Sequence, residues 1–162
     1  MFTQYLKVAE GKNGKGTFIS IEIPAGVPIA EANGPTHILN VSKTNNPNWL
    51  QVGVDIFMAA SGHMLPDYIN HSCDPNCYFH MMGNRAILYS LYVIPAGAEL
   101  LIDYSTSSTD TLETWQMQCS CGSHKCRKTI SGYQYLNPIL QEEYKSKGMI
   151  PLYITTQMFQ KV

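Results

Sequence analysis

The chain has 162 residues, 44% of them hydrophobic, and its formal net charge at pH 7 is −1. A chain of this length can bury about two thirds of its unfolded surface, so we expect one domain with a core of its own. A nearly neutral chain has no broad positive field for phosphate backbones or anionic lipid, so we expect no direct binding to nucleic acid or to a membrane.

The first half of the chain predicts short strands separated by turns. Residues 17–23 are β-branched and apolar, which favours a strand, and the sequence Pro24-Ala25-Gly26 should end it. The other elements expected in this half are a strand over 28–32, a polar loop over 35–47, a strand over 50–58 and a turn over 61–66.

The second half repeats this pattern before it changes. Residues 85–94 predict a long strand, and residues 100–104 predict another one after a turn at Pro95-Ala96-Gly97. The sequence Ile-Pro-Ala-Gly therefore occurs at two corners, 23–26 and 94–97, which indicates hairpin-like units of an antiparallel fold. Residues 105–111 are small and polar and predict a mobile linker.

One helix is predicted, near the end of the chain. Asn137 can cap a helix that begins at Pro138, because its side chain can accept from a free backbone N–H and proline suits the first helical position. Gly148 should end this helix. Short strands with a single terminal helix predict a mainly β (β+α) fold and not a doubly wound parallel sheet.

The start of the chain and its cysteine count bear on compartment and redox chemistry. The first residues lack the apolar run of a signal peptide, and no segment has the ~18 apolar residues of a membrane span. We therefore expect an intracellular, cytoplasmic protein, with a nuclear or host-targeted location left open. Five cysteines in such a chain favour thiol or metal chemistry over a disulfide framework.

Three of the cysteines form the pattern C-x-C-x4-C at Cys119, Cys121 and Cys126. Two cysteines one residue apart do not readily reach disulfide geometry, whereas a tetrahedral Zn²⁺ accepts them on a curled loop. A fourth ligand would have to come from His124, Cys73 or Cys77. Buried thiols beside a turn are the alternative interpretation.

Two further stretches could contact a ligand. Residues 70–77 read NHSCDPNC, which places a histidine, two asparagines and two cysteines close together. Residues 11–16 are glycine-rich but match neither a phosphate loop nor a dinucleotide fingerprint. A glycine turn lets the backbone approach a ligand closely, although an ordinary hairpin turn explains it as well.

Taken in order, these motifs resemble the SET domain of protein lysine methyltransferases, in the form of a small free-standing protein with a post-SET zinc loop. The resemblance covers roughly residues 3 to 132. It rests on four motifs: Gly14-Lys15-Gly16-Thr17-Phe18, the segment NHSCDPN at 70–76, the segment GAELLIDY at 97–104, and the C-x-C-x4-C pattern. It implies small antiparallel sheets with a threaded pseudoknot, a SET domain over 1–112, a post-SET loop over 113–132 and a helical extension over 133–162.

The resemblance also implies roles for individual residues. The backbone of Gly14-Lys15-Gly16 would surround the methionine part of S-adenosylmethionine, and Asn70 and His71 would hold its amino group and adenine. Tyr104 would face the transferred methyl group as the catalytic residue and as a cofactor contact. Threading would bring residues 70–73 beside Tyr104. We expect Asp103 to be a structural hydrogen-bond partner.

For the metal, the resemblance implies one Zn²⁺ with Cys73 as the fourth ligand, which leaves Cys77 as a packed thiol. The full ligand set would be Cys73, Cys119, Cys121 and Cys126.

The sequence departs from the family pattern in two places. Ile102 stands two residues before Tyr104, where the family often has the Phe or Tyr that limits the number of methyl groups, so this number stays open. Asp67-Tyr68 stands where the family commonly has Arg-Phe, which affects the local cofactor contacts.

The resulting hypothesis is S-adenosylmethionine-dependent methylation of a protein lysine, with histone tails as one substrate class. Methylation of a small amine such as a polyamine is an alternative that Ile102 and Asp67 favour. A zinc-stabilised binding module without activity is another. The sequence is compatible with a homo-oligomer and does not fix the oligomeric state.

Overall fold

The computed structural model describes residues 1–38, 49–59, 62, 65, 67–83, 85–109 and 115–159. The turn predicted over 61–66 and the loop predicted over 35–47 lie mostly outside these ranges. The strands of the described part are β1 (Leu6–Gly11), β2 (Gly14–Ile19), β3 (Pro28–Ala32), β4 (Thr36–Ile38), β5 (Leu50–Gly53), β6 (Ile56–Met58), β7 (Asn70–His71), β8 (Cys77–Met82), β9 (Arg85–Ser90), β10 (Leu101–Ile102), β11 (Gln116–Gln118) and β12 (Thr129–Ser131).

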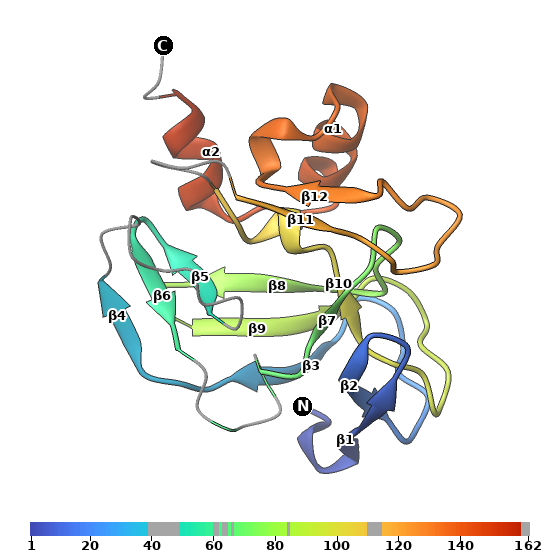
Figure 1. The fold of residues 1–162 in the computed structure, drawn as a ribbon. Helices are drawn as coiled ribbons and strands as arrows, with labels where there is room; N and C mark the ends of the chain where they lie inside the picture. The colour runs from blue at the N-terminus through green and yellow to red at the C-terminus, as the bar shows by residue number, and fades with distance from the viewer. Residues whose placement is uncertain are drawn as a thin grey trace.

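The strands form small separate sheets, most of them antiparallel (Figure 1). Two of the sheets have three strands, in the orders β3-β9-β8 and β4-β6-β5. Strands β1 and β2 form a two-stranded ribbon, as do β11 and β12. The pair β7–β10 is parallel. The mainly β fold class predicted from the sequence is confirmed.

The two Ile-Pro-Ala-Gly corners pair with each other. Ile23 and Ile94 form an antiparallel bridge, with N–H···O distances of 2.8 Å and 2.9 Å in the two directions. Both corners end in a glycine with positive φ, +74° at Gly26 and +84° at Gly97, a conformation that residues with a Cβ rarely adopt. The repeated tetrapeptide therefore marks one shared contact between two turns.

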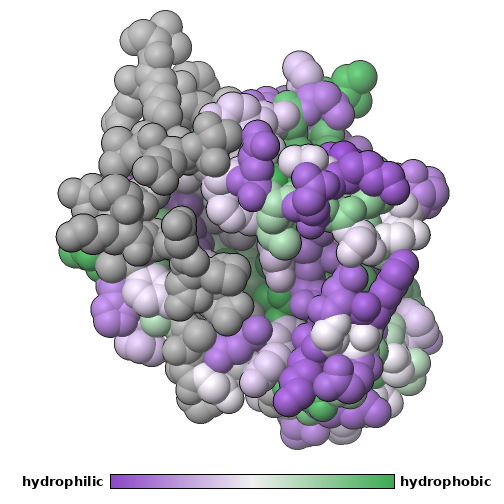
Figure 2. Space-filling view, viewed as in Figure 1, coloured by the Kyte–Doolittle hydropathy of each residue, from purple (hydrophilic) through white to green (hydrophobic). Residues whose placement is uncertain are grey.

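The main hydrophobic core lies between the β3-β9-β8 sheet, β2 and β10, and includes the fully buried Ile19, Leu88 and Leu100. A second cluster joins the C-terminal part of the chain to β8 through the half-buried Tyr78. Both clusters exclude water from apolar side chains, which is the main source of stability in a domain of this size. Figure 2 shows a mixed surface, with hydrophobic residues visible where the middle of this face is hollowed.

The predicted C-terminal helix is present as α1 (Pro138–Ser146), capped by a 2.9 Å hydrogen bond from the Leu140 N–H to Asn137 Oδ1. Gly148 follows it with φ of +67°. The sequence prediction of a single helix was wrong, because a second helix, α2 (Leu152–Phe159), follows directly. In the described part of the chain, no helix is both long enough and apolar enough to cross a membrane.

Three other sequence predictions were wrong in detail. Residues 50–58 are two strands and not one, because the chain turns at Asp55, which has a φ of +54°. Residues 36–38 form strand β4 within the predicted loop. The first residues of the predicted mobile linker, Ser105 and Thr106, are buried in a short 3-10 helix over Tyr104–Thr106. The linker's last two residues lie outside the described residues.

Candidate active site and metal centre

The parallel pair β7–β10 places the NHSC segment against the strand that leads to Tyr104. Asn70 pairs with Leu101 and His71 with Ile102. The Ser72 N–H then continues the pairing with a 2.9 Å hydrogen bond to the Ile102 carbonyl. Segments about thirty positions apart therefore lie side by side, as the predicted threading requires.

Tyr104 lies beside His71 with its hydroxyl group in a fixed position. The two ring centroids are 5.3 Å apart, and the Tyr104 hydroxyl donates a 2.8 Å hydrogen bond to the Ile69 carbonyl. Burial, followed by the nearby Glu99 carboxylate, raises the pKa of Tyr104 to about 12. The phenol therefore stays neutral at physiological pH, and its oxygen lone pairs remain available to accept a hydrogen bond.

His71 uses both ring nitrogens for contacts within the protein. Nδ1 accepts from the backbone N–H of Tyr104 at 3.2 Å, so the neutral ring carries its hydrogen on Nε2. Nε2 lies 3.3 Å from Cys73 Sγ. Burial lowers the pKa of His71 to about 4, with Asp103 opposing the shift and Arg127 adding to it. A contact from His71 to a cofactor would therefore have to come from its backbone, and the predicted role of this residue stays a prediction.

Asn70 links β7 to the glycine ribbon β1–β2. Its side-chain amide donates to the Lys15 carbonyl at 3.1 Å and to Glu99 Oε1 at 2.7 Å. A Cβ atom at Gly16 would overlap the Glu99 carboxylate, so this approach requires glycine at position 16. Gly14 has a φ of +90°, in the left-handed region that favours glycine. Asn70 and the glycine ribbon, both predicted to contact a cofactor, thus lie together, and the contacts themselves stay a prediction.

Asp103 is fully buried and connects several parts of the chain. It receives a bidentate ion pair from Arg127, with Nη2 2.8 Å from Oδ1, and a 2.8 Å hydrogen bond from the Tyr144 hydroxyl. Its Oδ1 also accepts from the Ser105 N–H. The carboxylate therefore holds the segment after β10, the loop after Cys126 and helix α1 in one network. This agrees with the structural role expected for Asp103.

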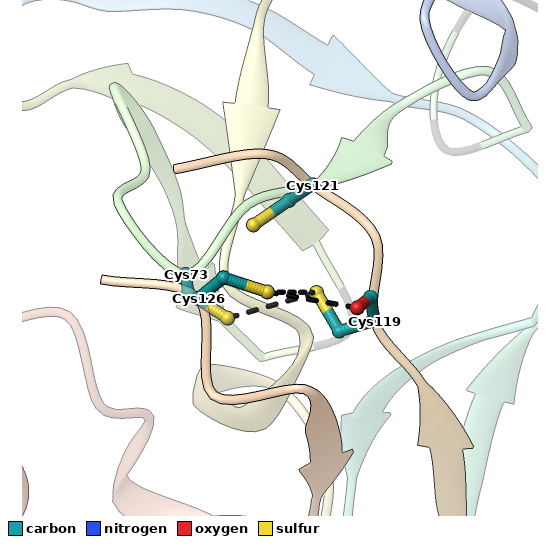
Figure 3. Close-up of side chains that lie close together, drawn as sticks. All are labelled: Cys73, Cys119, Cys121 and Cys126. Carbon is teal, nitrogen blue, oxygen red and sulfur yellow. Dashed lines mark hydrogen bonds between the residues drawn. The ribbon is translucent and has the colours of Figure 1, made fainter. Parts of the chain in front are cut away.

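Four cysteine side chains converge at one point (Figure 3). The Sγ atoms all lie within 4.8 Å of one another, and the Cys119 sulfur is 3.7 Å from the sulfurs of both Cys73 and Cys126. These distances are far longer than a disulfide bond of about 2.05 Å. A metal ion at about 2.3 Å from each of four thiolates in a tetrahedron would set the sulfurs about 3.8 Å apart. The cluster consists of Cys73, Cys119, Cys121 and Cys126.

The surroundings of the cluster give its thiols different pKa values. Burial raises the pKa of Cys73 to about 12, although the Arg127 backbone N–H lies 3.4 Å from its sulfur. Burial alone would raise the pKa of Cys121, but backbone hydrogen bonds from Cys73 and Ser123, together with contacts from the Cys119 and Cys126 side chains, lower this pKa to about 6. Protons held by such crowded sulfurs are what a divalent cation displaces when it binds.

The remaining candidate ligands lie outside the cluster. Cys77 is fully buried in the main hydrophobic core, as predicted for a packed thiol. His124 is not among the clustered ligand atoms. The cysteine loop does contact the turn between β1 and β2, where Lys12 Nζ lies 3.5 Å from the Cys121 carbonyl.

Sequence reasoning assigned no role to Glu99, Arg127 or Tyr144, which all contact site residues. Glu99 belongs to the motif GAELLIDY, and Arg127 directly follows Cys126, so both positions carried a signal. Tyr144 carried none, because its contact with Asp103 joins residues 41 positions apart.

Comparison with known proteins finds a matching family and related chains. A family model described as "SET domain" matches residues 8–105, which is more than half of the chain. Trithorax of Drosophila virilis, a histone-lysine N-methyltransferase, is 28% identical over 133 aligned positions, and the match covers 74% of this chain and 3% of the relative. The human histone-lysine N-methyltransferase 2B is 27% identical over 133 aligned positions, and the match covers 74% of this chain and 5% of the relative. The chain thus spans a small fraction of the length of these relatives.

A solved structure shows the same fold. The crystal structure of KRYPTONITE in complex with mCHG DNA and SAH superposes with a TM-score of 0.62 at 26% sequence identity. The superposition covers 76% of this chain and 28% of that one. A second KRYPTONITE complex, with mCHH DNA, an H3(1-15) peptide and SAH, has the same fold, with a TM-score of 0.60 at 24% identity over 76% of this chain and 29% of that one.

Proposed function

Because this chain belongs to the SET-domain family, we propose that it is an S-adenosylmethionine-dependent N-methyltransferase that acts on a lysine side chain of a protein. The relatives named histone-lysine N-methyltransferases support the reaction and make a histone tail the first substrate to test. The SAH bound to a structural neighbour at 26% identity supports the cofactor.

One observation carries the proposal, namely the β7–β10 pairing. It brings the Tyr104 hydroxyl onto the Ile69 carbonyl, next to Asn70, whose side chain contacts the glycine ribbon at the Lys15 carbonyl. Asn70 and the backbone around Lys15 would hold the cofactor's amino acid part. Tyr104, two residues after the end of β10, would face the sulfonium methyl group. When bound, the cofactor supplies a methyl carbon that the lysine Nζ lone pair attacks, with the C–S bonding pair leaving on sulfur and the surplus proton going to solvent.

The protein's part in this reaction is alignment and the exclusion of water. A lysine of pKa about 10.4 costs about 4.6 kcal/mol to deprotonate at pH 7. An apolar channel disfavours the ammonium form and lowers this cost without a dedicated base. The Tyr104 hydroxyl, whose hydrogen is already donated to Ile69, can accept a hydrogen bond from the amine and orient it.

We also propose that the cysteine cluster binds one Zn²⁺. The donor set fits, because four thiolates with two sulfur–sulfur distances of 3.7 Å match a closed tetrahedral structural site. Cys73, Cys119, Cys121 and Cys126 would hold the ion, and the ion would hold the loop after residue 118 against β7. This assignment supports a division into a SET domain over 1–112, a post-SET zinc loop over 113–132 and a helical extension over 133–162.

The test is transfer of a labelled methyl group from S-adenosylmethionine. The purified protein is incubated with core histones, with a protein extract and with spermidine, and the products are analysed by mass spectrometry. The proposal expects label on lysine of at least one protein. Label on spermidine alone would favour the small-amine alternative, and no label in any reaction, with SAH bound, would favour a binding module.

A further inference from the structure

Glu99 occupies a position that the proposed function leaves unexplained. Its carboxylate lies against two glycines of the β1–β2 ribbon, where a Cβ on Gly16 would overlap Oε1 and a Cβ on Gly11 would lie 3.0 Å from Oε2. Its Oε1 also accepts the 2.7 Å hydrogen bond from Asn70. A half-buried carboxylate therefore sits among the predicted cofactor contacts.

The backbone around Glu99 fixes this position. Phe18 in β2 forms an antiparallel bridge with Glu99, and the Glu99 carbonyl accepts a 2.8 Å hydrogen bond from the Asn76 side chain. Asn76 Oδ1 in turn accepts from the Leu101 N–H at 2.8 Å. Both the ribbon and the NHSCDPN segment thus hold the residue, so the carboxylate is placed by the fold.

No cation neutralises this carboxylate within the described part of the chain. The ion pairs found there join other acids, for example Glu31 with Arg85 and Asp103 with Arg127. Position 67, where the family commonly has arginine, is Asp67. A carboxylate without a cationic partner among the described residues, beside a predicted ligand site, can accept a positively charged ligand group.

The hydrogen bonds of Asn70 indicate which ligand group could bind beside Glu99. Its two amide hydrogens are used by the Lys15 carbonyl and Glu99 Oε1. The described residues leave Asn70 Oδ1 without a donor, so this oxygen is the amide's remaining binding atom. Oδ1 belongs to the same amide group as the Nδ2 atom that binds Glu99, so Oδ1 and the carboxylate lie near each other, and both can only accept hydrogen bonds.

We propose that Glu99 is a cofactor-binding residue whose carboxylate, together with Asn70 Oδ1, accepts the ammonium group of the cofactor's methionine part. This inference rests on the proposed function. It also gives a reason for glycine at position 16, because a Cβ atom there would overlap the Glu99 carboxylate and displace it.

The test compares two ligands by isothermal titration calorimetry. SAH carries the ammonium group, whereas methylthioadenosine has the same nucleoside and thioether but lacks the amino acid part. Both are titrated into the wild-type protein, into Glu99→Gln and into Glu22→Gln, a matched control at an exposed glutamate. A misfolded fraction lowers the number of binding sites but not the Kd, so the comparison of Kd values does not depend on complete folding.

The inference expects Glu99→Gln to weaken SAH about 10-fold, as for the loss of a charge-assisted hydrogen bond, and to change methylthioadenosine less than about twofold. Glu22→Gln should change neither. Unchanged SAH affinity in Glu99→Gln, or an equal loss for both ligands, overturns the inference. A wild-type protein that binds neither ligand overturns the proposed function itself, and the role of Glu99 with it.

Discussion

The hydroxyl of Tyr144 in helix α1 donates a 2.8 Å hydrogen bond to Asp103, the residue directly before Tyr104. Asp103 is completely buried and also pairs with Arg127 from the cysteine loop. The C-terminal helix and the cysteine loop therefore share the carboxylate that directly precedes the candidate catalytic tyrosine. Because α1 lies beyond the residues that match the family model, this contact ties the helix to the candidate active site.

We expect Tyr144→Phe to destabilise the fold by about 1–2 kcal/mol. The substitution removes the hydroxyl and leaves a buried Asp103 oxygen with one hydrogen bond fewer. Urea denaturation followed by circular dichroism measures the change. Tyr135→Phe is the control, because Tyr135 is 53% exposed and should lose almost nothing. Equal stability of both variants would show that the Tyr144 contact contributes nothing.

Tyr104→Phe should reduce kcat by about 100-fold while changing the Kd of SAH by less than about threefold. The variant keeps the ring beside His71 but loses the oxygen that can orient the amine. Steady-state kinetics with the best protein substrate and calorimetry with SAH separate the two effects. Tyr5→Phe, at an exposed position, serves as the control. A Tyr104→Phe variant with unchanged kcat would remove the catalytic role of the hydroxyl.

Cys73→Ser should lower the bound metal well below one ion per chain and loosen the segment after residue 115. Cys73 supplies one of the four converging sulfurs, and three ligands hold a structural ion less tightly than four. Metal analysis of the purified protein and limited proteolysis measure these two effects.

Cys77→Ala is the matched control for this change. Its sulfur lies in the hydrophobic core, so the variant should lose some stability but keep its metal. If both variants bind the same amount of metal as the wild-type protein, the proposed ligand set is wrong. A strong chelator should reproduce the Cys73→Ser effect in the wild-type protein.

The pKa of Tyr104 predicts a loss of stability at high pH. Burial raises this pKa from about 10 in the unfolded chain to about 12, so the folded protein holds its proton more tightly. The stabilisation is fully present below pH 10 and is lost as the pH rises through 12. Urea midpoints between pH 9 and 12 should therefore fall less steeply for Tyr104→Phe than for the wild-type protein. Parallel curves for the two proteins would contradict this assignment.

The sequence predicted the parts of the fold that depend on local chemistry. Pro95-Ala96-Gly97 and Asn137-Pro138 act through φ restrictions and capping, and a turn and a helix start occur at these places. Helix α2 was missed because its Tyr153, Ile154 and Thr155 favour strands, and burial of Ile154 in the second hydrophobic cluster overrides that preference.

The site was predictable as a set of residues and not as an arrangement. Motifs singled out Asn70, Tyr104 and the clustered cysteines, because the chemistry requires those residue types. The role of His71 as a bridge between Cys73 and the Tyr104 backbone depends on the β7–β10 pairing, which no local pattern specifies. Ser105 and Thr106 were misread as a linker because their polarity is satisfied by buried contacts with Ser131 and Asp103.

The most direct test of the proposed function is the chemical identity of the methylated product. Histones treated with this protein and S-adenosylmethionine are digested to peptides, and tandem mass spectrometry locates any added methyl group. The account predicts methyl groups on the Nζ atom of lysine, formed about 100-fold more slowly when Tyr104→Phe replaces the wild-type protein. Active, cofactor-binding protein that methylates only a residue other than lysine, or only free amines, would contradict it.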